Sequence, residues 1–579
     1  MLNKIIPSPF VGYVLATFLA VFTYFYGLDG LHIPTNGDEL PYAHITRLTA
    51  DSGHLLPLQS QLHEMRNTKP PLLFWQGIAS TNWGQSWSLW NLRYPSVIYT
   101  LLTALLVFLL ASKLAQLQTV EGNQTPTETG FIAALTFLAF YSTYRFGRPF
   151  LINPAEVFWF FLPFFSLLYW RAFAFDSKIS VPLILGAEVG IGLLYKSFAL
   201  VVPVGLALAW WYLHQRDYRW KAFMQKDAWK IVIVGALSLS MFGLWFVFDP
   251  DPSAVWNEFI IGENAGKFDP HGGSYFANLL WGGSSVWALL LGYPMNAGLL
   301  AFPVFAVFLI SYRRRLRLSD SEKMLWIWMI VLFVVFTLPS QRTARYLLEA
   351  MPGLAVLCAL NWQRINRGYF VASLLLSGCV LALLAFLSWR LQMEMPGSGV
   401  YSTAYWILLF VASALTLIAI AWARYTRALV NVVVLLVMLA LAAFLQPLDG
   451  DAGNFSTQAQ RYAAGKDVWT PCNFRAVDEG YRFLLPGAHV HGYLSDSTSS
   501  LSIAELSGKY NLFAVQVPLQ EKCEGCNIIG QRLEMRSRHS PEEIRRILSG
   551  EVFQLLFTKE LLLEVPLVIP ATPVVEGCR

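Results

Sequence analysis

The sequence TNGDELPYAHITR begins at Thr35, and the same polar interval ends at Trp75 with NTKPPLLFW. It is the first long polar interval of the chain, and an apolar segment precedes it. It carries an adjacent acidic pair, Asp38 and Glu39, and a Lys-Pro-Pro run that starts at Lys69. We therefore expect this interval to be the mouth of a membrane-embedded site, around which the other loops gather.

The composition predicts a polytopic membrane protein. Of 579 residues, 55% are hydrophobic and only 14% are charged, against about 25% charged in soluble domains. Apolar runs of about 18 to 25 residues recur up to residue 446, long enough for a hydrocarbon core of about 30 Å. The runs do not alternate apolar and polar residues, so we expect helices rather than barrel strands.

About 13 transmembrane helices are predicted. We expect them near residues 10–26, 95–110, 131–144, 150–170, 181–194, 198–213, 231–248, 285–311, 324–338, 347–360, 370–389, 405–422 and 430–445. The first segment lacks a small-residue cleavage site, so it is expected to be a retained helix. The domain of residues 1–446 then contains a first outer loop at about 28–91.

Basic residues fall in alternate loops. They are Lys113, Arg171, Lys178, Arg216, Arg219, Lys221, Lys226, Lys230, Arg313, Arg314, Arg315, Arg317, Arg364, Arg367, Arg424 and Arg427. The positive-inside bias makes these loops cytoplasmic. The net charge of +5 thus reflects topology and does not indicate a nucleic-acid partner. An odd number of helices places the C-terminal region on the outer side of the membrane.

Residues 447–579 change character and predict a small α/β domain. Strand-like runs occur at 488–493, 512–517, 552–558 and 561–568. The stretch Ser540–Leu548 predicts a helix because a serine N-cap precedes a proline. In an oxidising compartment the four cysteines here, Cys472, Cys523, Cys526 and Cys578, favour disulfide formation. The C-E-G-C pair could instead bind a metal ion, and the spacing does not assign the pairing.

The outer loops carry polar residues that converge on one face of the membrane domain. They are Asp38, Glu39, Lys69, Arg148, Asn153, Glu156, Lys196, Glu258, Lys267, Arg342, Arg345 and Tyr346. Charges at span ends and in tight turns indicate an anionic ligand at the lipid interface. Phosphate is the natural candidate, because arginine and lysine both bind it.

Each residue also has a simpler interpretation. Asp38 could serve only as the N-cap of a helix that Gly53 ends. Glu156 could pair only with Arg148. The basic residues Lys69, Arg342 and Arg345 could extend to lipid headgroups, and the interface alone could explain Lys196.

The motifs GDELPYAHITR, SGHLLP and KPPLLFW resemble the first outer loop of the bacterial aminoarabinose transferases, which modify lipid A. They are also similar to the wider protein O-mannosyltransferase-type superfamily, the membrane glycosyltransferases of the C fold. Further similar segments lie at Gly192–Pro203, Trp256–Phe259 and Leu338–Pro352. The resemblance covers the membrane domain in order.

This resemblance implies inverting transfer of a sugar from a polyprenyl-phosphate donor, undecaprenyl in bacteria, on the outer face of the bacterial inner membrane. The active site and the C-terminal domain are then expected on the periplasmic side. Asp38 matches the catalytic carboxylate of the family, and we expect Glu39 to orient the acceptor or a basic neighbour. Four residues match or adjoin positions expected to bind the donor phosphate: Lys69, Lys267, Arg345 and Tyr346. The substrate-binding candidates are Arg148, Asn153, Lys196 and Glu258.

Four positions depart from the aminoarabinose enzymes and their relatives. Thr68 stands where they have glutamate, Asn257 and Phe259 replace two histidines, and Asn153 replaces a usual aspartate. A metal ion would lose ligands, so no cofactor is expected, although a divalent metal stays open. The sugar and the acceptor also stay open: lipid A, a protein hydroxyl or an envelope polysaccharide. A polyprenyl-lipid flippase is the alternative of another class, but we find no paired halves of the kind transporters show.

Overall fold

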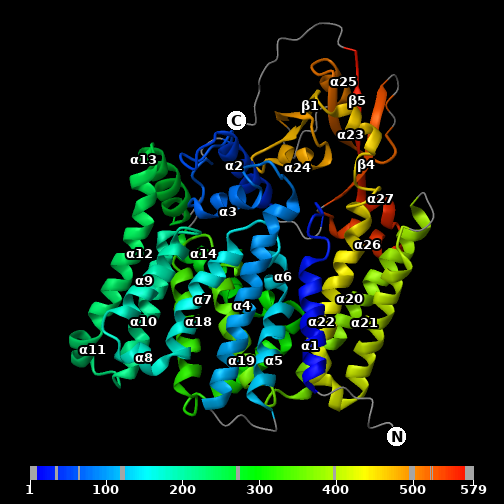
Figure 1. Ribbon diagram of the computed structural model, residues 1–579. Coiled ribbons are helices and arrows are strands. Elements are labelled where there is room, and N and C mark those ends of the chain that lie inside the picture. The colour runs from blue at the N-terminus through cyan, green and yellow to red at the C-terminus, as the bar shows by residue number, and fades with distance from the viewer. Residues whose placement is uncertain are drawn as a thin grey trace.

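The computed structural model describes residues 9–32, 37–62, 65–117, 124–268, 274–395, 400–494, 502–521, 523, 526–536 and 538–566. A long helical bundle carries two short helices and a small α/β domain at one end (Figure 1). The long bundle helices are α1 (Pro9–Phe25), α4 (Leu89–Leu117), α5 (Pro126–Ala139), α7 (Asn153–Tyr169), α9 (Ser180–Leu193), α10 (Val201–Gln215), α12 (Ala228–Phe248), α17 (Ala301–Arg313), α18 (Asp320–Phe336), α19 (Met351–Leu360), α20 (Arg367–Glu394), α21 (Thr403–Ala421) and α22 (Ala423–Leu445).

Shorter elements connect these helices. They are α2 (Glu39–Asp51), α3 (Leu72–Ser80), α6 (Tyr141–Gly147), α8 (Arg171–Asp176), α11 (Trp220–Lys226), α13 (Pro252–Ala254), η3 (Val255–Asn264), η4 (Ala265–Phe268), α14 (Tyr275–Trp281), α15 (Val286–Leu290), α16 (Gly292–Ala297) and η6 (Ala344–Ala350). Short 3-10 turns lie at η2 (Phe198–Leu200), η5 (Gly298–Leu300) and η7 (Gln446–Leu448).

Seven helices of the described residues are long and apolar enough to cross a membrane, and two shorter apolar helices accompany them. The protein is therefore a multi-pass helical membrane protein, as the composition predicts. The total of about 13 spans stays a prediction, because helices such as α7 and α19 fall short of the full crossing length.

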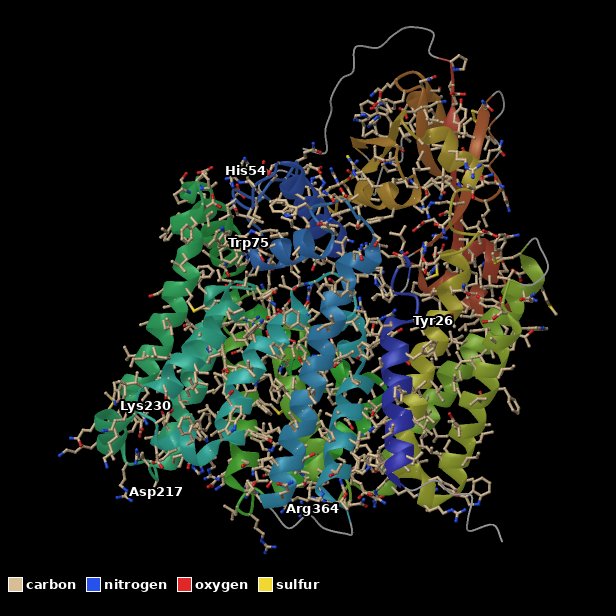
Figure 2. All side chains as sticks on the ribbon, viewed as in Figure 1. Tyr26, His54, Trp75, Asp217, Lys230 and Arg364 are labelled. Atoms are coloured by element: carbon tan, nitrogen blue, oxygen red, sulfur yellow. A yellow bond between two sulfur atoms is a disulfide. The ribbon has the colours of Figure 1, made fainter. Side chains whose placement is uncertain are left out.

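The two ends of the bundle differ as the loop charges predict. Asp217, Lys230 and Arg364 lie at one end, whereas His54 and Trp75 of the first outer loop lie at the other (Figure 2). The α/β domain lies at the same end as α2 and α3 (Figure 1). The candidate site residues and the C-terminal domain thus share one face; its assignment as periplasmic stays a prediction.

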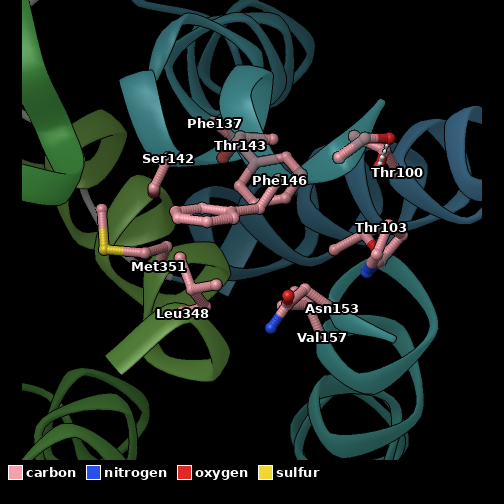
Figure 3. A pocket seen from close by; sticks show the side chains of 12 residues that line it. Thr100, Thr103, Phe137, Ser142, Thr143, Phe146, Asn153, Val157, Leu348 and Met351 are labelled. Atoms are coloured by element: carbon pink, nitrogen blue, oxygen red, sulfur yellow. Dashed lines mark hydrogen bonds between the residues drawn. The ribbon is translucent and has the colours of Figure 1, made fainter. Parts of the chain in front are cut away.

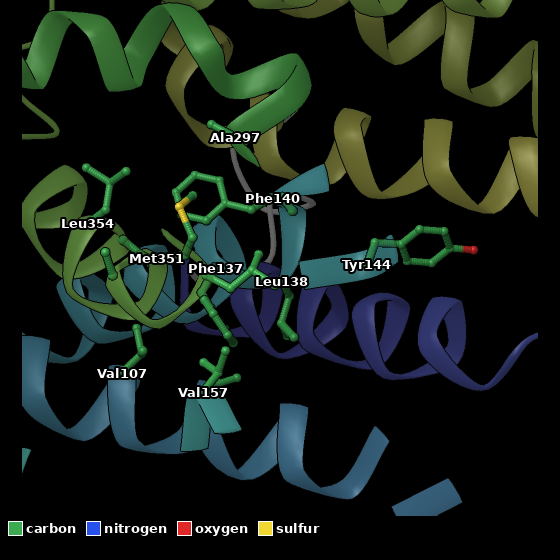
Figure 4. Close-up of a cluster of buried hydrophobic side chains, with 14 of the residues drawn as sticks. Val107, Phe137, Leu138, Phe140, Tyr144, Val157, Ala297, Met351 and Leu354 are labelled. Carbon is green, nitrogen blue, oxygen red and sulfur yellow. The ribbon is translucent and has the colours of Figure 1, made fainter. Parts of the chain in front are cut away.

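The core of the bundle is a continuous apolar cluster. Phe137, Phe140, Val157, Met351 and Leu354 belong to it and come from three segments of the chain (Figure 4). Val157 lies near the start of α7, the same end of the helix that carries the candidate site residues Asn153 and Glu156. The candidate site therefore rests on a packed, apolar support.

The first outer loop packs on the bundle through a second apolar cluster, which includes Tyr42, Phe74 and Phe150. Helix α3 approaches closely at Gly77. A Cβ atom there would lie 2.7 Å from both Phe150 Cζ and Thr46 Cγ2, closer than carbon atoms tolerate without movement. The short apolar segment after the Lys-Pro-Pro run is thus a helix, α3, that packs between α2 and the start of α7.

The C-terminal domain contains a five-stranded sheet in the order β2-β1-β3-β5-β4. Its strands are β1 (Asp467–Cys472), β2 (His489–Leu494), β3 (Leu512–Val517), β4 (Asn527–Met535) and β5 (Phe557–Glu564). Strand β1 is parallel to both β2 and β3, and β5 is antiparallel to β3 and β4. The helices are α23 (Thr457–Ala463), α24 (Val477–Leu484), α25 (Ile503–Ser507), α26 (Pro541–Ser549) and α27 (Val552–Leu556).

The predicted α/β class of this domain is confirmed, with one wrong element. Residues 552–556 form α27 rather than a strand, because a short apolar run is compatible with either state. Strands β1 and β4 were not predicted, since a proline interrupts β1 and polar residues fill β4. The predicted helix is confirmed as α26, which Ser540 and Glu543 begin with a reciprocal capping box.

Cys523 and Cys526 form a disulfide, and Cys472 is also disulfide-bonded. The disulfide interpretation of this region is confirmed, and the alternative of a metal site at the C-E-G-C pair is wrong. Cys578 lies outside the described residues.

The close approach at Gly77 gives a testable prediction. Gly77→Ala forces Phe150 or Thr46 to move and should destabilise the protein by about 1–3 kcal/mol. Gly235→Ala is the matched control, because this helical glycine has no neighbour within 4 Å of its Cβ position; alanine there should stabilise the helix by up to about 1 kcal/mol. Thermal unfolding in detergent measures both, and equal effects would contradict the packing described.

Candidate active site

Asp38 occupies the N-cap position of α2, but its side chain forms no capping hydrogen bond. Its Oδ2 instead accepts a hydrogen bond from Arg345 Nη1 at 2.5 Å, and its side chain is 47% exposed. The interpretation of Asp38 as a helix cap alone is therefore wrong. The carboxylate is charge-paired and also accessible to a ligand.

Glu39, the next residue, is buried and holds α2 in place. Both of its oxygens accept hydrogen bonds from Arg93 of α4, at 2.6 and 2.8 Å. The Phe150 N–H donates to the same carboxylate at 2.8 Å. Arg93 also donates to the carbonyls of Leu28 and Gly30. Glu39 thus orients a basic neighbour, and this contact fixes where Asp38 stands.

Arg345 lies on η6 and bridges two elements. Its Nε and Nη2 donate to Asn153 Oδ1 at 3.0 and 2.6 Å, while its Nη1 reaches Asp38. The guanidinium also lies over the Phe146 ring, 5.2 Å from its centroid. A planar guanidinium held at three points presents a fixed direction to a ligand.

The network continues into the bundle. Asn153 Nδ2 donates to Glu156 at 3.0 Å, and Lys196 Nζ lies 2.8 Å from the other oxygen of Glu156. The Glu349 carboxyl lies beside that of Glu156 and is buried. The prediction that Glu156 pairs with Arg148 is wrong: Lys196 is its cationic partner.

Arg148 lies outside this network. It is 1% exposed and donates to the carbonyls of Tyr24 and Tyr26 and to the Tyr144 hydroxyl. These bonds satisfy carbonyls at the C-terminal end of α1, where a helix leaves its acceptors unpaired. The residue holds α1 against α6.

Lys69 lies under the loop that contains α13 and η3. Its Nζ contacts Glu263 Oε1 at 2.5 Å and the Thr68 carbonyl at 2.8 Å. Glu258 of the same loop accepts from the backbone and side-chain nitrogens of Asn67, at 2.8 and 3.2 Å. The loop and the Lys-Pro-Pro run are therefore tied together by two carboxylates.

Tyr42 links the two clusters. It is buried on α2, and burial together with the Asp38, Glu263 and Glu156 carboxylates raises the pKa of its hydroxyl, against the opposing effect of Arg345. Tyr42 is therefore within electrostatic reach of both the Asp38–Arg345 pair and Glu263, the partner of Lys69.

Two residues predicted to bind the donor phosphate remain, Tyr346 and Lys267. Tyr346 stacks on Phe336, with 5.1 Å between ring centroids. Lys267 lies in η4, and its side chain lies outside the described residues.

A small cavity of about 20 Å³ lies beside Asn153, between α4, α6 and α7 (Figure 3). It has room for about one water molecule.

A second cluster joins α2 to the C-terminal domain. Glu479 of α24 is fully buried and accepts from Arg47 at 2.9 and 3.0 Å. His44 Nδ1 lies 3.3 Å from the same carboxylate, and Arg482 Nε lies 3.4 Å away. His44 Nε2 accepts from the Gln61 N–H, so a neutral His44 carries its proton on Nδ1 and donates to Glu479. The helix that begins at Asp38 is therefore bonded to the C-terminal domain as well as to the bundle.

Comparison with known proteins agrees with this architecture. The family model for dolichyl-phosphate-mannose-protein mannosyltransferase matches residues 12–256. The chain is 24% identical over 424 residues to an undecaprenyl phosphate-alpha-4-amino-4-deoxy-L-arabinose arabinosyl transferase of Proteus mirabilis, and the alignment covers 70% of each chain. It is 25% identical to the corresponding transferase of Edwardsiella ictaluri, with 57% of this chain and 55% of that one covered.

The fold is similar to that of ArnT from Cupriavidus metallidurans. The structure with undecaprenyl phosphate bound superposes with a TM-score of 0.57 at 16% identity, covering 95% of this chain and 97% of that one. The chain therefore has an ArnT-like fold. The resemblance to the aminoarabinose transferases and protein mannosyltransferases is thereby confirmed at the level of sequence and fold.

Some site residues escaped sequence reasoning. Arg93 and Glu263 are among the polar residues of the outer loops, but the ion pairs that they form were not predicted, and Glu349 was not predicted as a site residue. Nothing in their spacing indicates which carboxylate meets which cation. Glu479 lies in the C-terminal domain and could not be linked to α2 without the fold.

The Glu479 cluster predicts an acid-sensitive contact. Burial opposes ionisation, but hydrogen bonds from His44 and Arg47 and the charge of Arg482 prevail and lower the pKa of Glu479 to about 2. Because the folded pKa lies below the ordinary value, the stabilisation is complete above about pH 4.5 and is lost as the pH falls toward 2. A shift of this size is worth about 3 kcal/mol.

Hydrogen exchange of α2 and α24 measures this effect. Protection of both helices should fall together as the pH falls from about 4.5 toward 2 in the wild-type protein. Glu479→Gln should lower protection at neutral pH and flatten the acid dependence, while Glu542→Gln, an exposed change on α26, should do neither. An unchanged acid profile in Glu479→Gln would contradict the assignment.

Proposed function

We propose that the protein transfers a sugar from a polyprenyl-phosphate donor, undecaprenyl phosphate in bacteria, to a hydroxyl group of an envelope acceptor. The reaction takes place at the periplasmic face of the inner membrane. The observation that carries the proposal is the hydrogen bond from Arg345 to the accessible carboxylate of Asp38, in the first outer loop. The relatives whose names include undecaprenyl phosphate support this donor.

The donor phosphate is neutralised by Arg345 and Lys69. Each cation contacts a carboxylate in the structure, Asp38 and Glu263 respectively. A phosphate that arrives between them replaces or shares these contacts, and the cations then stabilise the charge that develops on the leaving phosphate. Tyr346, next to Arg345 on η6, and Lys267 are further candidates for donor contact.

Asp38 acts as general base. It accepts the proton of the acceptor hydroxyl while that oxygen forms a bond to the anomeric carbon. The bond from the anomeric carbon to the phosphate oxygen breaks, and its electron pair leaves with the polyprenyl phosphate. Attack from the face opposite the leaving group inverts the configuration. The proton on Asp38 then passes to solvent.

The other candidates support these groups. Arg345 is held by a chain of hydrogen-bonded residues: Asn153, Glu156 and Lys196. Glu258 accepts a hydrogen bond from Asn67, two residues before Lys69. Arg148 serves the packing of α1. We assign them positioning roles. The identity of the sugar stays open, and the acceptor is lipid A or another envelope glycan, with a protein hydroxyl as the alternative. Charges that gather at one end of the bundle favour an interfacial enzyme over a flippase.

The first test is Asp38→Asn. It keeps the shape of the side chain but removes the base, so transfer should fall by about 10²–10⁴-fold at equal protein level. Mass spectrometry of lipid A and envelope glycans from expressing cells measures the product. Asp51→Asn, at the exposed end of the same helix, is the matched control and should retain activity. Wild-type product with Asp38→Asn would exclude Asp38 as the base.

The second test is donor binding. Arg345→Gln and Lys69→Gln each remove a charge-assisted hydrogen bond, worth about 1.5–3 kcal/mol, so affinity for undecaprenyl phosphate should fall about 10- to 150-fold. Arg145→Gln is the control, because Arg145 is exposed and bonds only to Tyr141 in the described structure. Binding to the purified protein in nanodiscs measures this. Equal affinities for all variants would contradict the assigned phosphate site.

A further inference from the structure

A groove of about 480 Å³ lies between α10, α11 and α18. Every side chain that lines it is apolar or aromatic, and Leu206, Leu213 and Val334 are among them. Leu206 and Leu213 are seven residues apart on α10, so the groove follows that helix for about 10 Å. Leu206 and Val334 are about half exposed, so the groove opens toward the lipid around the bundle. Its volume is in the range of small-molecule sites.

Aromatic side chains mark one end of the groove, which adjoins α11 and lies far from α2 and α3 (Figure 1). Asp217 and Tyr218 in the turn after α10 are left-handed, at φ 50° and 58°, a conformation that bulky residues rarely adopt. The Tyr218 N–H donates to the Leu213 carbonyl at 3.0 Å, and Trp210 Nε1 donates to the Tyr218 hydroxyl at 3.4 Å. Tryptophan and tyrosine are enriched where a membrane meets water, so this end lies at the level of the lipid headgroups.

Helix α11 has the pattern of a helix that lies along the membrane surface. Trp220 and Met224 are 63% and 50% exposed, and a spacing of four residues places them on one face. Phe223 beside them is buried against the bundle. Lys221 and Lys226 are exposed and flank this apolar face, one on each side. A helix of this kind lies with its apolar face in the lipid and its basic residues among the headgroups.

The basic residues of this segment outnumber its carboxylates. Residues 216–230 contain five basic and two acidic residues. The two carboxylates pair with three of the cations: Asp227 with Arg216 and Lys230, and Asp217 with Arg219. Within the part of the chain that the structure describes, no ion pair involves the other two. Lys221 and Lys226 therefore leave two uncompensated ammonium groups on the helix at the aromatic end of the groove.

We propose that the groove and these two lysines form a binding site for one anionic phospholipid, in the leaflet opposite the candidate active site. An acyl chain of the lipid lies along α10 and α18, and the ammonium groups of Lys221 and Lys226 bind the headgroup phosphate as point charges. The loop charges predict that this leaflet is the cytoplasmic one, whose anionic lipids attract basic segments. The site is separate from the sugar-transfer reaction and does not depend on it.

Native mass spectrometry of the full-length protein tests the proposal. The protein is equilibrated with equal amounts of phosphatidylglycerol and phosphatidylcholine that carry the same acyl chains. Each lysine near an anionic headgroup is worth about tenfold in binding or slightly less, so the wild-type protein should retain about 10- to 30-fold more phosphatidylglycerol. The double variant Lys221→Gln, Lys226→Gln should reduce this preference to less than about twofold at an unchanged melting temperature. Ala209→Phe, which fills the groove, should reduce retention of both lipids.

The matched control is the double variant Lys113→Gln, Arg424→Gln. It removes the same charge from α4 and α22, which do not line the groove, and the preference should persist there. Equal retention of the two lipids by the wild-type protein would overturn the proposal, as would an unchanged preference in the Lys221, Lys226 variant. Displacement of phosphatidylglycerol by soluble glycerol phosphate, or full retention in Ala209→Phe, would also overturn it, because the phosphate would then bind without the groove.

Discussion

The buried pair of Glu39 and Arg93 is the constraint on which the outer end of the protein depends. Arg93 comes from α4 and also bonds to carbonyls that follow α1, while Glu39 begins α2 and accepts from the backbone just before α7. Four segments meet at one ion pair. Breaking a buried pair by removing one partner is costly, because it leaves an uncompensated charge. The pair therefore holds α2 in one place, and with it the position of Asp38.

In the proposed mechanism, Asp38 can act as the base because Glu39 fixes the position of α2. Glu39 is buried and accepts three hydrogen bonds, whereas Asp38 pairs with Arg345 and remains about half exposed. Two adjacent carboxylates thus have separate tasks. The cations divide in a similar way: Arg93 and Arg148 bond to backbone carbonyls, while Arg345 and Lys69 pair with Asp38 and Glu263, contacts that the proposed donor phosphate would replace or share.

Much of this could be predicted from the sequence, and the limits have physical causes. Apolar run length indicates spans, and the loop charges give the two ends, so the face shared by Asp38, Lys69 and Arg345 follows from topology. Pairing does not follow, because Arg148 is the nearer cation to Glu156 in sequence, and only the helix packing selects Lys196, 40 residues away. Asp38 obeys the statistics of an N-cap position, but the nearby guanidinium competes for its side chain. In the C-terminal domain, a short apolar run at α27 was compatible with strand or helix, and the polar strand β4 gave no signal.

The central claim is that the donor phosphate lies between Arg345 and Lys69, next to Asp38. The most direct measurement is an experimental structure of the protein with undecaprenyl phosphate bound. The account predicts phosphate oxygens within about 2.7–3.2 Å of Arg345 and Lys69 nitrogens, with Glu263 displaced from Lys69. A phosphate bound elsewhere, with the Asp38–Arg345 and Lys69–Glu263 contacts unchanged, would contradict it.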